Sequence, residues 1–444
     1  MRRSNRSIFL FWAPLAATWL MMAFEGPFLA AVIARLADPK FNLAAHGVAF
    51  AFAILVEAPV IMLMSAATAL VEDATSYRRL RTFANALNAG STALLLLVLV
   101  PPVFDLVMRT LVGLPDGVAD LTYGALWLFL PWPAAIGVRR FLQGVLIRSG
   151  RTRLVALGTV IRLVAMATTA LTLYFALDLP GAWVGAASLS AGVCVEAIAA
   201  RFMAARSVRE LLEGPAVADP ASGALGYRRI AEFYVPLALT SLLGLTVQPM
   251  LTFFMGRAPY PVESLAVFPV VHALSFIFRA LGLSYQDAAI ALMGRRHEHF
   301  PELARFGAGL GLAASAGLGL IAFTPLAPVW FETISGLSPE LAAFALTPAR
   351  ILVPIPALSV LLSFQRAILM QGRTTRPITM ATAIEVGTIA VLFVLGGWVA
   401  GLVGATAAFL AFLGGRIGST SYLLSGCASA LRRSRSGEPR GPGA

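Results

Sequence analysis

The chain has 444 residues, of which 58% are hydrophobic and only 13% are charged. Soluble domains carry roughly 25% charged residues, so this composition excludes an ordinary water-soluble fold. The net charge of +12 is compatible with nucleic-acid binding in a soluble protein. Here, however, the basic residues lie in short segments between long apolar runs, which is typical of membrane proteins, and we expect no nucleic-acid partner.

A helix needs about 20 apolar residues to cross roughly 30 Å of hydrocarbon. The first apolar run is too long for a signal-peptide core and contains Glu25, so we expect it to be retained. Twelve runs have sufficient length, near residues 8–34, 43–71, 83–108, 121–147, 154–177, 181–203, 230–256, 262–292, 303–330, 341–370, 377–397 and 400–426.

The distribution of Lys and Arg predicts the orientation of these spans. With a cytoplasmic N-terminus, 23 of the 34 basic residues fall in cytoplasmic segments and span edges, and four fall in segments on the outer side of the membrane. Positive residues are enriched on the cytoplasmic side of membrane proteins. We therefore predict a multi-pass protein of the cytoplasmic (inner) membrane with both termini in the cytoplasm.

The sequence contains an internal repeat. Residues Phe11–Thr18 (FWAPLAAT) match Phe233–Thr240 (FYVPLALT), and we call the separation of these two stretches along the chain the repeat offset. Pro27 and Pro249 lie at the same offset, as do the Gly-Arg-Thr motifs at 150–152 and 372–374, while Pro-Trp-Pro at 131–133 and Pro-Ile-Pro at 354–356 lie one position further apart. Six spans per repeat predict an all-α fold with two six-helix bundles related by a pseudo-twofold axis along the membrane normal.

The repeat predicts how the chain divides. We expect an N-terminal lobe at 1–203, a polar cytoplasmic linker at 204–229 and a C-terminal lobe at 230–426. Residues 427–444 are rich in arginine, serine, glycine and proline, and are predicted to be a disordered basic tail near anionic lipid. Two similar bundles joined by a linker suit alternating access, in which one bundle rocks against the other.

Ionisable residues inside the spans are the candidates for function, because a charge in hydrocarbon must face a cavity or a partner. Arg162 and Glu196 lie at the same depth on neighbouring spans, and Glu385 and Arg416 repeat this arrangement with exchanged signs. We predict a structural ion pair in each lobe, with a proton relay as the alternative reading.

Two carboxylates are candidates for coupling to a cation. Glu25 and Glu57 each lie two residues before a proline, Pro27 and Pro59. A proline interrupts the helical hydrogen bonds and frees carbonyl oxygens that can join a carboxylate in holding H⁺ or Na⁺. The alternative is a neutral carboxyl group that is hydrogen-bonded to its neighbours.

Span eight carries the candidates for substrate binding. His272 and Arg279 are seven residues apart and share a helix face, with Asp287 near it. A guanidinium in a closed cavity can hold a carboxylate or phosphate, although Arg279 could instead pair with an acid on a facing helix. Arg350 and Gln248 are further candidates for the substrate site.

Other basic residues allow more than one reading. Arg139 and Arg140 in span four could each face the bundle interior or extend to the lipid headgroups, and the sequence does not decide between these two directions. Arg366 is expected to extend toward the headgroups. No His/Cys/Asp/Glu spacing typical of a metal site and no Walker A motif are present, so we predict neither a metal nor another cofactor.

Four stretches resemble a known superfamily. They are Phe24-Glu25, Gln248-Pro249 through Arg257, Phe268-Pro-Val-Val-His272, and Arg350-Ile351 with Pro354-Ile-Pro356. Together with the six-plus-six arrangement, they resemble the MOP (multidrug/oligosaccharidyl-lipid/polysaccharide) exporter superfamily, which includes multidrug and toxin extrusion (MATE) pumps and the lipid II flippase. The likeness is nearest to the progressive-ankylosis branch.

The resemblance implies a V-shaped pair of lobes with a cavity lined by spans one, two, seven and eight. It also implies secondary transport coupled to protons or sodium, and the branch is associated with export of small anions. We expect a monomeric, non-enzymatic exporter of a small anionic or amphipathic solute; the alternative is a flippase for a lipid-linked saccharide or other lipid. An intramembrane enzyme is a weaker alternative, because the polar residues within the spans are spread over both lobes. A receptor or scaffold without transport is another, and it would show no ion- or gradient-dependent flux.

Overall fold

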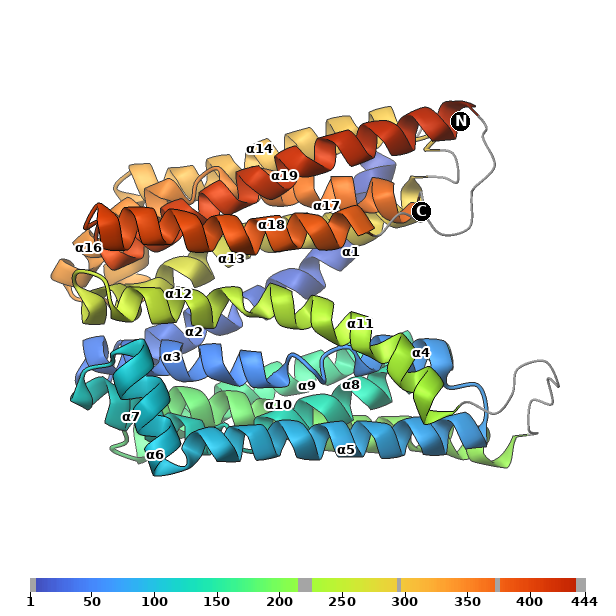
Figure 1. Ribbon diagram of the computed structural model, residues 1–444, viewed down its shortest axis with the longest axis horizontal. Helices are drawn as coiled ribbons and strands as arrows, with labels where there is room; N and C mark the ends of the chain where they lie inside the picture. Colours follow the sequence, from blue (N-terminus) through green and yellow to red (C-terminus); the bar gives the residue numbers. More distant parts are fainter. Residues whose placement is uncertain (1–4, 215–225, 294–296, 372–375, 437–444) are drawn as a thin grey trace. The chain divides into compact units, whose positions relative to one another are not determined.

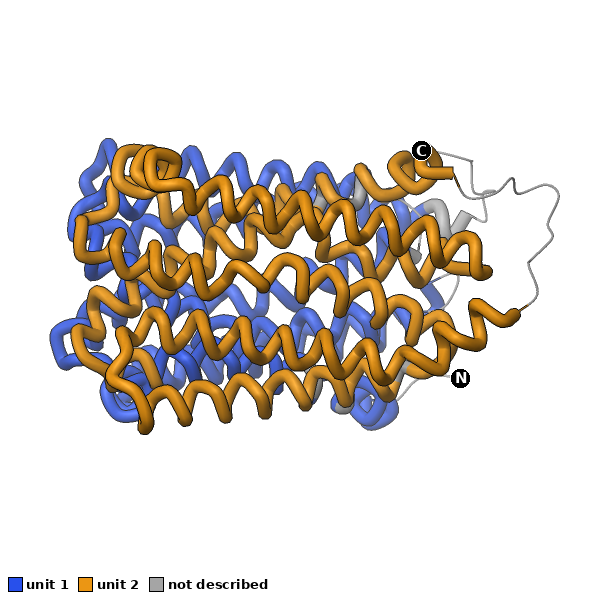
Figure 2. Tube along the Cα trace, turned by 90° about the horizontal axis from the view of Figure 1, so that it is seen from below, with its two compact units in different colours: residues 1–31, 254–444 blue, residues 32–253 orange. Residues whose placement is uncertain are grey.

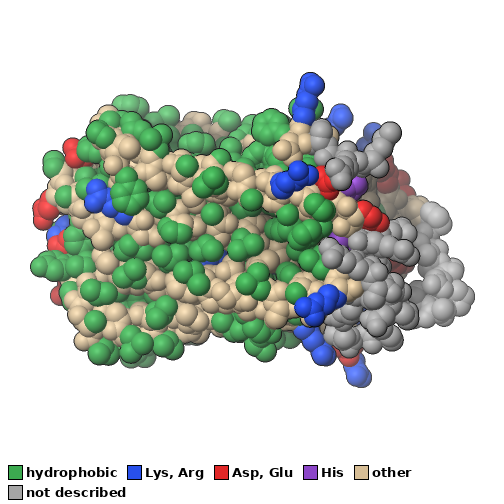
Figure 3. All heavy atoms as spheres, turned by 90° about the horizontal axis from the view of Figure 1, so that it is seen from above, with side chains coloured by type: hydrophobic (Ala, Val, Ile, Leu, Met, Phe, Trp, Pro, Cys, Tyr) green, Lys and Arg blue, Asp and Glu red, His purple; other side chains and the backbone are tan. Residues whose placement is uncertain are grey.

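The computed structural model describes residues 5–214, 226–293, 297–371 and 376–436 (Figure 1), and all its regular elements in these ranges are helices. Ten helical segments in them are long and apolar enough to cross a membrane. The chain is therefore an all-α, multi-pass membrane protein, as predicted. Figure 3 shows apolar side chains spread over the described part of the face in view.

Two of the twelve predicted spans are not among these ten segments. The run at 230–256 divides into α11 (Tyr227–Leu245) and α12 (Val247–Gly256), and the apolar stretch found among its described residues is Ser241–Gly256. The run at 400–426 lies in α19 (Gly404–Ser436), a helix of 33 residues. Glycine, serine and threonine residues around Arg416 lower its hydropathy, and small residues of this kind allow close helix packing.

The helices group into two compact units, residues 1–31 with 254–444 (unit 1) and residues 32–253 (unit 2), drawn in different colours in Figure 2. Unit 2 contains α3 (Pro39–Glu57), α4 (Leu63–Leu70), α5 (Ala74–Leu99), α6 (Pro101–Phe104), the π-helical segment η1 (Asp105–Val112), α7 (Asp116–Leu128), α8 (Trp132–Arg148), α9 (Thr152–Ala176), α10 (Gly181–Glu213) and α11.

Unit 1 contains α1 (Asn5–Ala23), α13 (Pro261–Leu292), α14 (Phe300–Phe323), α15 (Leu326–Pro328), the π-helical segment η2 (Val329–Ile334), α16 (Pro339–Ile351), α17 (Ile355–Gln371), α18 (Arg376–Phe393), the π-helical segment η3 (Val394–Val399) and α19. The chain passes from one unit to the other within α2 (Glu25–Ile33) and again within α12.

Packing therefore groups the first helix of each repeat with helices of the other repeat. Helix α1 belongs to unit 1 although it precedes the rest of the first repeat, and α11 belongs to unit 2. The predicted lobes at 1–203 and 230–426 follow chain order, so they describe the sequence repeat rather than these compact units. Hydropathy shows where a helix crosses the membrane, but it carries no information about which helices become its neighbours.

The helix bounds recur at the repeat offset. Helix α11 begins and ends at the positions that the offset predicts from α1, and α13 spans the same stretch as α3 and α4 together. Helices α16, α17 and α19 begin and end one position beyond the equivalents of α7, α8 and α10, the same extra step that separates the two Pro-X-Pro motifs. The Gly-Arg-Thr motif at 372–374 lies outside the described residues, but these bounds confirm the repeat independently.

The repeat extends to the backbone at the start of α3 and α13. Asp38 and Tyr260, which are equivalent at the repeat offset, both have positive φ (47° and 54°). Each directly precedes the proline with which its helix begins. Non-glycine residues rarely adopt this conformation. Proline is favoured in the first turn because the amide it lacks there has no partner within the helix.

Equivalent hydrogen bonds then hold the start of α10 and α19. The Asn42 side-chain oxygen accepts from the backbone amide of Ala182 (2.9 Å), and the Ser264 hydroxyl accepts from that of Ala405 (3.0 Å). Amides in the first turn of a helix have no partner within it, so a side chain from a neighbouring helix fixes the register of the pair.

Two predicted non-membrane segments are partly helical. Helix α10 continues to Glu213 and α19 to Ser436, so residues 427–436 are not the disordered tail that composition predicted. Both stretches are rich in alanine, arginine or leucine, which favour helix, and neither contains proline. The linker residues 215–225 and the tail residues 437–444 lie outside the described residues.

Candidate functional site

Unit 2 contains a buried charge cluster centred on Glu196 of α10. This carboxylate is completely buried and accepts hydrogen bonds from Arg139 (2.6 Å) and Gln143 (3.1 Å) of α8. The Arg162 Nε atom of α9 lies 3.3 Å from the same carboxylate. The predicted Arg162–Glu196 contact is therefore present, but it is one side of a network in which two arginines share one acid.

Glu57 ends α3 beside this cluster. Residues 58–62 form a turn that separates α3 from α4, and Pro59 lies in it. Glu57 is buried, its Oε2 atom accepts a hydrogen bond from the Trp132 indole (2.5 Å), and it interacts electrostatically with Arg140 and Arg139. A carboxylate beside a break in a helix, within reach of buried guanidinium groups, has the features expected of a site that exchanges a proton or cation.

Unit 1 contains a second cluster between α13, α17, α18 and α19. Arg416 of α19 lies 2.9 Å from Glu385 of α18, and Ser419 donates a hydrogen bond to the other carboxylate oxygen (3.1 Å). This is the second predicted ion pair. Arg366 of α17 is half-buried and interacts electrostatically with both Glu385 and Arg416.

Arg279 of α13 joins the cluster through an aromatic ring. Its guanidinium carbon lies 5.0 Å from the centre of the Phe412 ring, and that of Arg416 lies 5.5 Å from the same ring. A nitrogen of Arg279 is also 3.4 Å from His272 Nε2, two helical turns earlier on α13. Cations interact favourably with aromatic faces, so Phe412 stabilises two guanidinium groups that would otherwise repel each other.

The unit 1 cluster is rich in positive charge. Arg279, Arg366 and Arg416 all interact electrostatically with one carboxylate, that of Glu385. Buried charge is costly in hydrocarbon unless it is compensated, so a cluster of this composition favours an anion as a further partner. Arginine suits this role because its planar group offers several donors to carboxylate or phosphate oxygens.

The repeat relates several positions of the two clusters. Glu57 and Arg279 are equivalent at the repeat offset, and Arg162 and Glu385 are equivalent with the one extra position, with the sign of the charge inverted in both cases. Gln143 and Arg366 are equivalent in the same way as Arg162 and Glu385. Two framework positions therefore carry opposite charges in the two repeats.

The structure places the remaining predicted residues in different settings. Glu25 begins α2, and Gly26 beside it approaches Ala273 so closely that a Cβ atom there would lie 3.2 Å from the Ala273 side chain. Glu25 thus lies near the part of α13 that carries His272, in unit 1. Gln248 is half-buried on α12, in the stretch that belongs to unit 2.

Asp287 and Arg350 lie away from the unit 1 cluster. Asp287 is exposed near the end of α13, where it accepts a hydrogen bond from Trp19. Arg350 is exposed at the end of α16 and donates to the carbonyl of Ala322 (3.1 Å), close to the end of α14. A basic side chain at the C-terminus of a helix satisfies carbonyls that lack partners.

Sequence reasoning did not single out Trp132, Gln143, Ser419 or Phe412. Gln143 could have been found from the repeat, because its equivalent is the ionisable residue Arg366. The other three carry no signal in one sequence, since tryptophan, serine and phenylalanine are common in membrane helices. A groove of about 360 Å³ between α18, η3 and α19 is separate from both clusters and is lined by apolar residues such as Leu395 and Leu410.

Solved structures share this fold over nearly the whole chain. An inward-facing MATE-family multidrug resistance transporter of the MOP superfamily matches with a TM-score of 0.66 and 14% identity, covering 95% of this chain and 98% of the other. The lipid II flippase MurJ in an inward closed conformation gives 0.72 and 12%, covering 96% and 91%. The Vibrio cholerae MATE transporter VcmN in its bent form gives 0.59 and 13%, covering 97% and 99%.

These likenesses define the class of the protein as a polytopic membrane protein with the fold of MATE transporters and MurJ. At such low identity they establish the fold alone. No protein-family model matches the sequence, and no curated protein matches it.

Proposed function

We propose that the protein is a secondary-active transporter of the MOP superfamily that exports a small anionic or amphipathic solute by alternating access. The observation that carries the proposal is the arginine-rich cluster of unit 1, in which Arg416 pairs with Glu385 at 2.9 Å and Arg279 lies against the same Phe412 ring as Arg416. The likeness to MATE transporters over the whole chain supports transport as the general activity.

In this proposal, Arg279 and His272 contact the solute and Arg366 adds positive charge. The Glu385–Arg416 pair and Phe412 position Arg279, since a guanidinium over an aromatic ring has few alternative orientations. Gln248, Asp287 and Arg350 remain candidates for contacts elsewhere along the path. Placement at the progressive-ankylosis branch, whose members export small anions, is part of the same proposal.

Glu25 and Glu57 are proposed to couple transport to H⁺ or Na⁺. Both lie where a helix is interrupted, at the α1–α2 junction and at the end of α3. Protonation of Glu57 would remove its charge while Arg139 and Arg140 keep theirs, which changes the electrostatics of the unit 2 cluster. That change is the physical link between the gradient and the conformation.

The test is uptake into proteoliposomes under an imposed proton or sodium gradient, with a panel of carboxylates, phosphates, organic cations and lipids. We expect gradient-driven flux of an anion, a raised KM in Arg279→Ala and loss of gradient dependence in Glu57→Gln or Glu25→Gln. Arg228→Ala is the matched control, because Arg228 is exposed and pairs only locally with Glu232. Gradient-independent flux, or normal affinity in Arg279→Ala, would contradict the proposal.

The second candidate is a lipid flippase, favoured by the TM-score of 0.72 against MurJ. A flippase moves a fluorescent lipid-linked substrate between leaflets and leaves small soluble anions where they are. The lipid arm of the same vesicle experiment separates the two functions.

A further inference from the structure

The first helix of each repeat is held on its unit by a few buried side chains. On α11, Ile230 and Tyr234 are buried, whereas Val235 and Leu239 are about half exposed. On α1, Trp12 is buried with Ile8 and Ala16, whereas neighbouring apolar side chains are exposed. Each of these two helices is therefore attached to its unit through the side that carries these buried residues.

Tyr234 attaches α11 to unit 2. Its hydroxyl donates a hydrogen bond to the carbonyl of Pro59, in the turn between α3 and α4. Its ring packs edge-on against Phe83 of α5, with the ring centres 5.2 Å apart. A carbonyl outside a regular helix needs such a donor in the membrane, because hydrocarbon offers no water to replace it.

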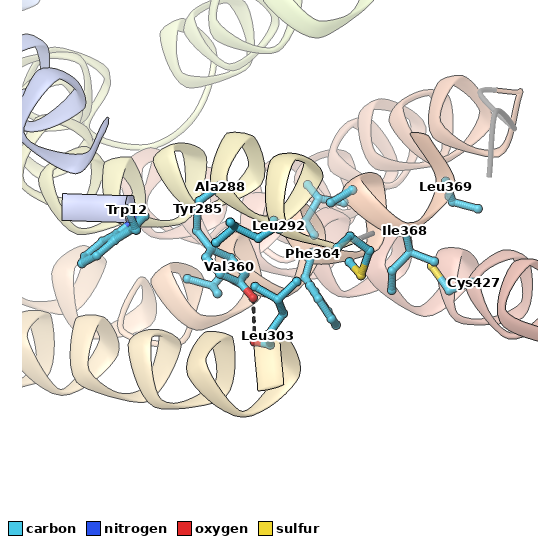
Figure 4. Close-up of a cluster of buried hydrophobic side chains, with 14 of the residues drawn as sticks. Trp12, Tyr285, Ala288, Leu292, Leu303, Val360, Phe364, Ile368, Leu369 and Cys427 are labelled. Atoms are coloured by element: carbon cyan, nitrogen blue, oxygen red, sulfur yellow. Dashed lines mark hydrogen bonds between the residues drawn. The ribbon is translucent and has the colours of Figure 1, made fainter. Parts of the chain in front are cut away.

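Trp12 attaches α1 to unit 1 in the same way. Its indole donates to the Ser284 hydroxyl of α13 (2.8 Å), and that hydroxyl donates to the carbonyl of Leu281 (2.8 Å). The indole also packs edge-on against Phe306 of α14, at 5.8 Å. Figure 4 shows Trp12 at one end of the buried cluster that continues through Tyr285, Val360 and Phe364.

The two attachments are equivalent in the repeat at the donor, at the accepting carbonyl and at the packing ring. Trp12 and Tyr234 are equivalent at the repeat offset, and so are the acceptor positions Pro59 and Leu281. The packing rings Phe83 and Phe306 are equivalent with the one extra position. Tyr234 donates directly to the carbonyl of Pro59, whereas Trp12 is linked to the carbonyl of Leu281 through a serine hydroxyl. Independent helix–helix contacts have no reason to coincide at donor, acceptor and ring.

We propose that Trp12 and Tyr234 are positioning residues of transport: equivalent donors that hold α1 on unit 1 and α11 on unit 2. Each helix continues directly into α2 or α12, through which the chain passes to the other unit. The donor must leave its acceptor before the helix can change its neighbours, so the two hydrogen bonds limit conformational exchange. The role in transport rests on the proposed function, whereas the attachment itself does not.

The test is hydrogen exchange, measured by mass spectrometry on the full-length protein in lipid nanodiscs. Tyr234→Phe removes only the hydroxyl and keeps the ring against Phe83. We expect exchange to become about tenfold faster in residues 227–245 and in the turn 58–62, with the rest of unit 2 unchanged. Trp12→Phe should accelerate exchange in α1 alone, and Trp12→Tyr, which keeps a donor, should restore part of the protection.

Tyr123→Phe is the matched control, because Tyr123 also donates from its hydroxyl to a carbonyl of another helix of unit 2, that of Leu99 (3.2 Å). The proposal is overturned if Tyr234→Phe leaves α11 unchanged, if Tyr123→Phe accelerates α11 equally, or if exchange rises throughout unit 2. This measurement needs no substrate. If exchange responds as expected but the vesicles show no flux of any solute or lipid, the proposed function fails and the attachment stands.

In vesicles that do transport, Tyr234→Phe should alter kcat by at least about threefold and leave KM unchanged, since the residue acts on the helix and not on the solute. Tyr123→Phe should leave both unchanged. Unaltered kcat in Tyr234→Phe would overturn the role in transport.

Discussion

Replacing the Glu196 carboxylate is the sharpest test of the buried network in unit 2. Glu196→Gln keeps the size of the side chain but leaves two guanidinium groups, at 2.6 Å (Arg139) and 3.3 Å (Arg162), without their shared anion. Removing one partner of a buried ion pair costs about 3–5 kcal/mol, because the remaining charge is uncompensated. This is a large part of the roughly 5–15 kcal/mol by which proteins are typically stable.

The assay is the free energy of unfolding in mixed micelles titrated with sodium dodecyl sulfate. Glu232→Gln is the matched control, because Glu232 pairs with Arg228 at 2.8 Å but both side chains are mostly exposed. An exposed pair contributes at most about 1 kcal/mol. If Glu196→Gln is no more destabilising than Glu232→Gln, the reasoning about buried charge is refuted.

The same network predicts the outcome of exchanging charges. Combining Arg162→Glu with Glu196→Arg would keep a simple pair, but here it places a second guanidinium beside Arg139. We therefore expect the exchanged protein to be less stable than wild type. Glu196→Gln combined with Arg139→Met and Arg162→Met should recover stability relative to Glu196→Gln alone, since no unpaired charge remains among these three side chains. A fully stable exchanged variant would show that Arg139 contributes little.

Two further predictions concern helix packing and capping. Gly144→Ala should strongly destabilise unit 2, because its Cβ would overlap the backbone carbonyl oxygen of Met64 on α4. Gly90→Ala on α5 has free space and should be neutral or stabilising by up to about 1 kcal/mol; equal thermal stabilities would contradict this packing. Asp73 caps α5 by accepting from Ser76, and these hydrogen bonds lower the pKa of Asp73. Its contribution is therefore present above its ordinary pKa and is lost as the pH falls through the lowered pKa of the folded protein. Asp73→Ala should thus cost about 0.5–2 kcal/mol near neutral pH and progressively less as the solution is made more acidic.

Much of the fold follows from the sequence because its signals are local or periodic. Long apolar runs predict membrane helices, and matches such as Phe11–Thr18 with Phe233–Thr240 predict the repeat that the helix bounds confirm. The grouping of α1 and α11 could not be predicted in this way. It depends on which residues of other helices the buried side chains of α1 and α11 meet, Ile8, Trp12 and Tyr234 among them, and a single sequence does not reveal those partners.

The candidate site could be predicted only in part, like the fold. Equal depth in the membrane brought Arg162 together with Glu196, and Arg416 with Glu385, as the contacts show. Depth alone could not reveal that Arg139 shares the same acid. A carboxylate has two oxygens and several lone pairs, so the number of its partners is fixed only by packing.

The inverted charges at residues 57 and 279 have a consequence for how such a chain could have arisen. A half-length ancestor that paired with a second copy of itself would have presented the same residue at this position twice, two acids or two bases. Only after the halves were joined in one gene could one copy keep glutamate while the other acquired arginine. Fusion thus permits a division of labour, and either Glu57→Arg or Arg279→Glu would undo it.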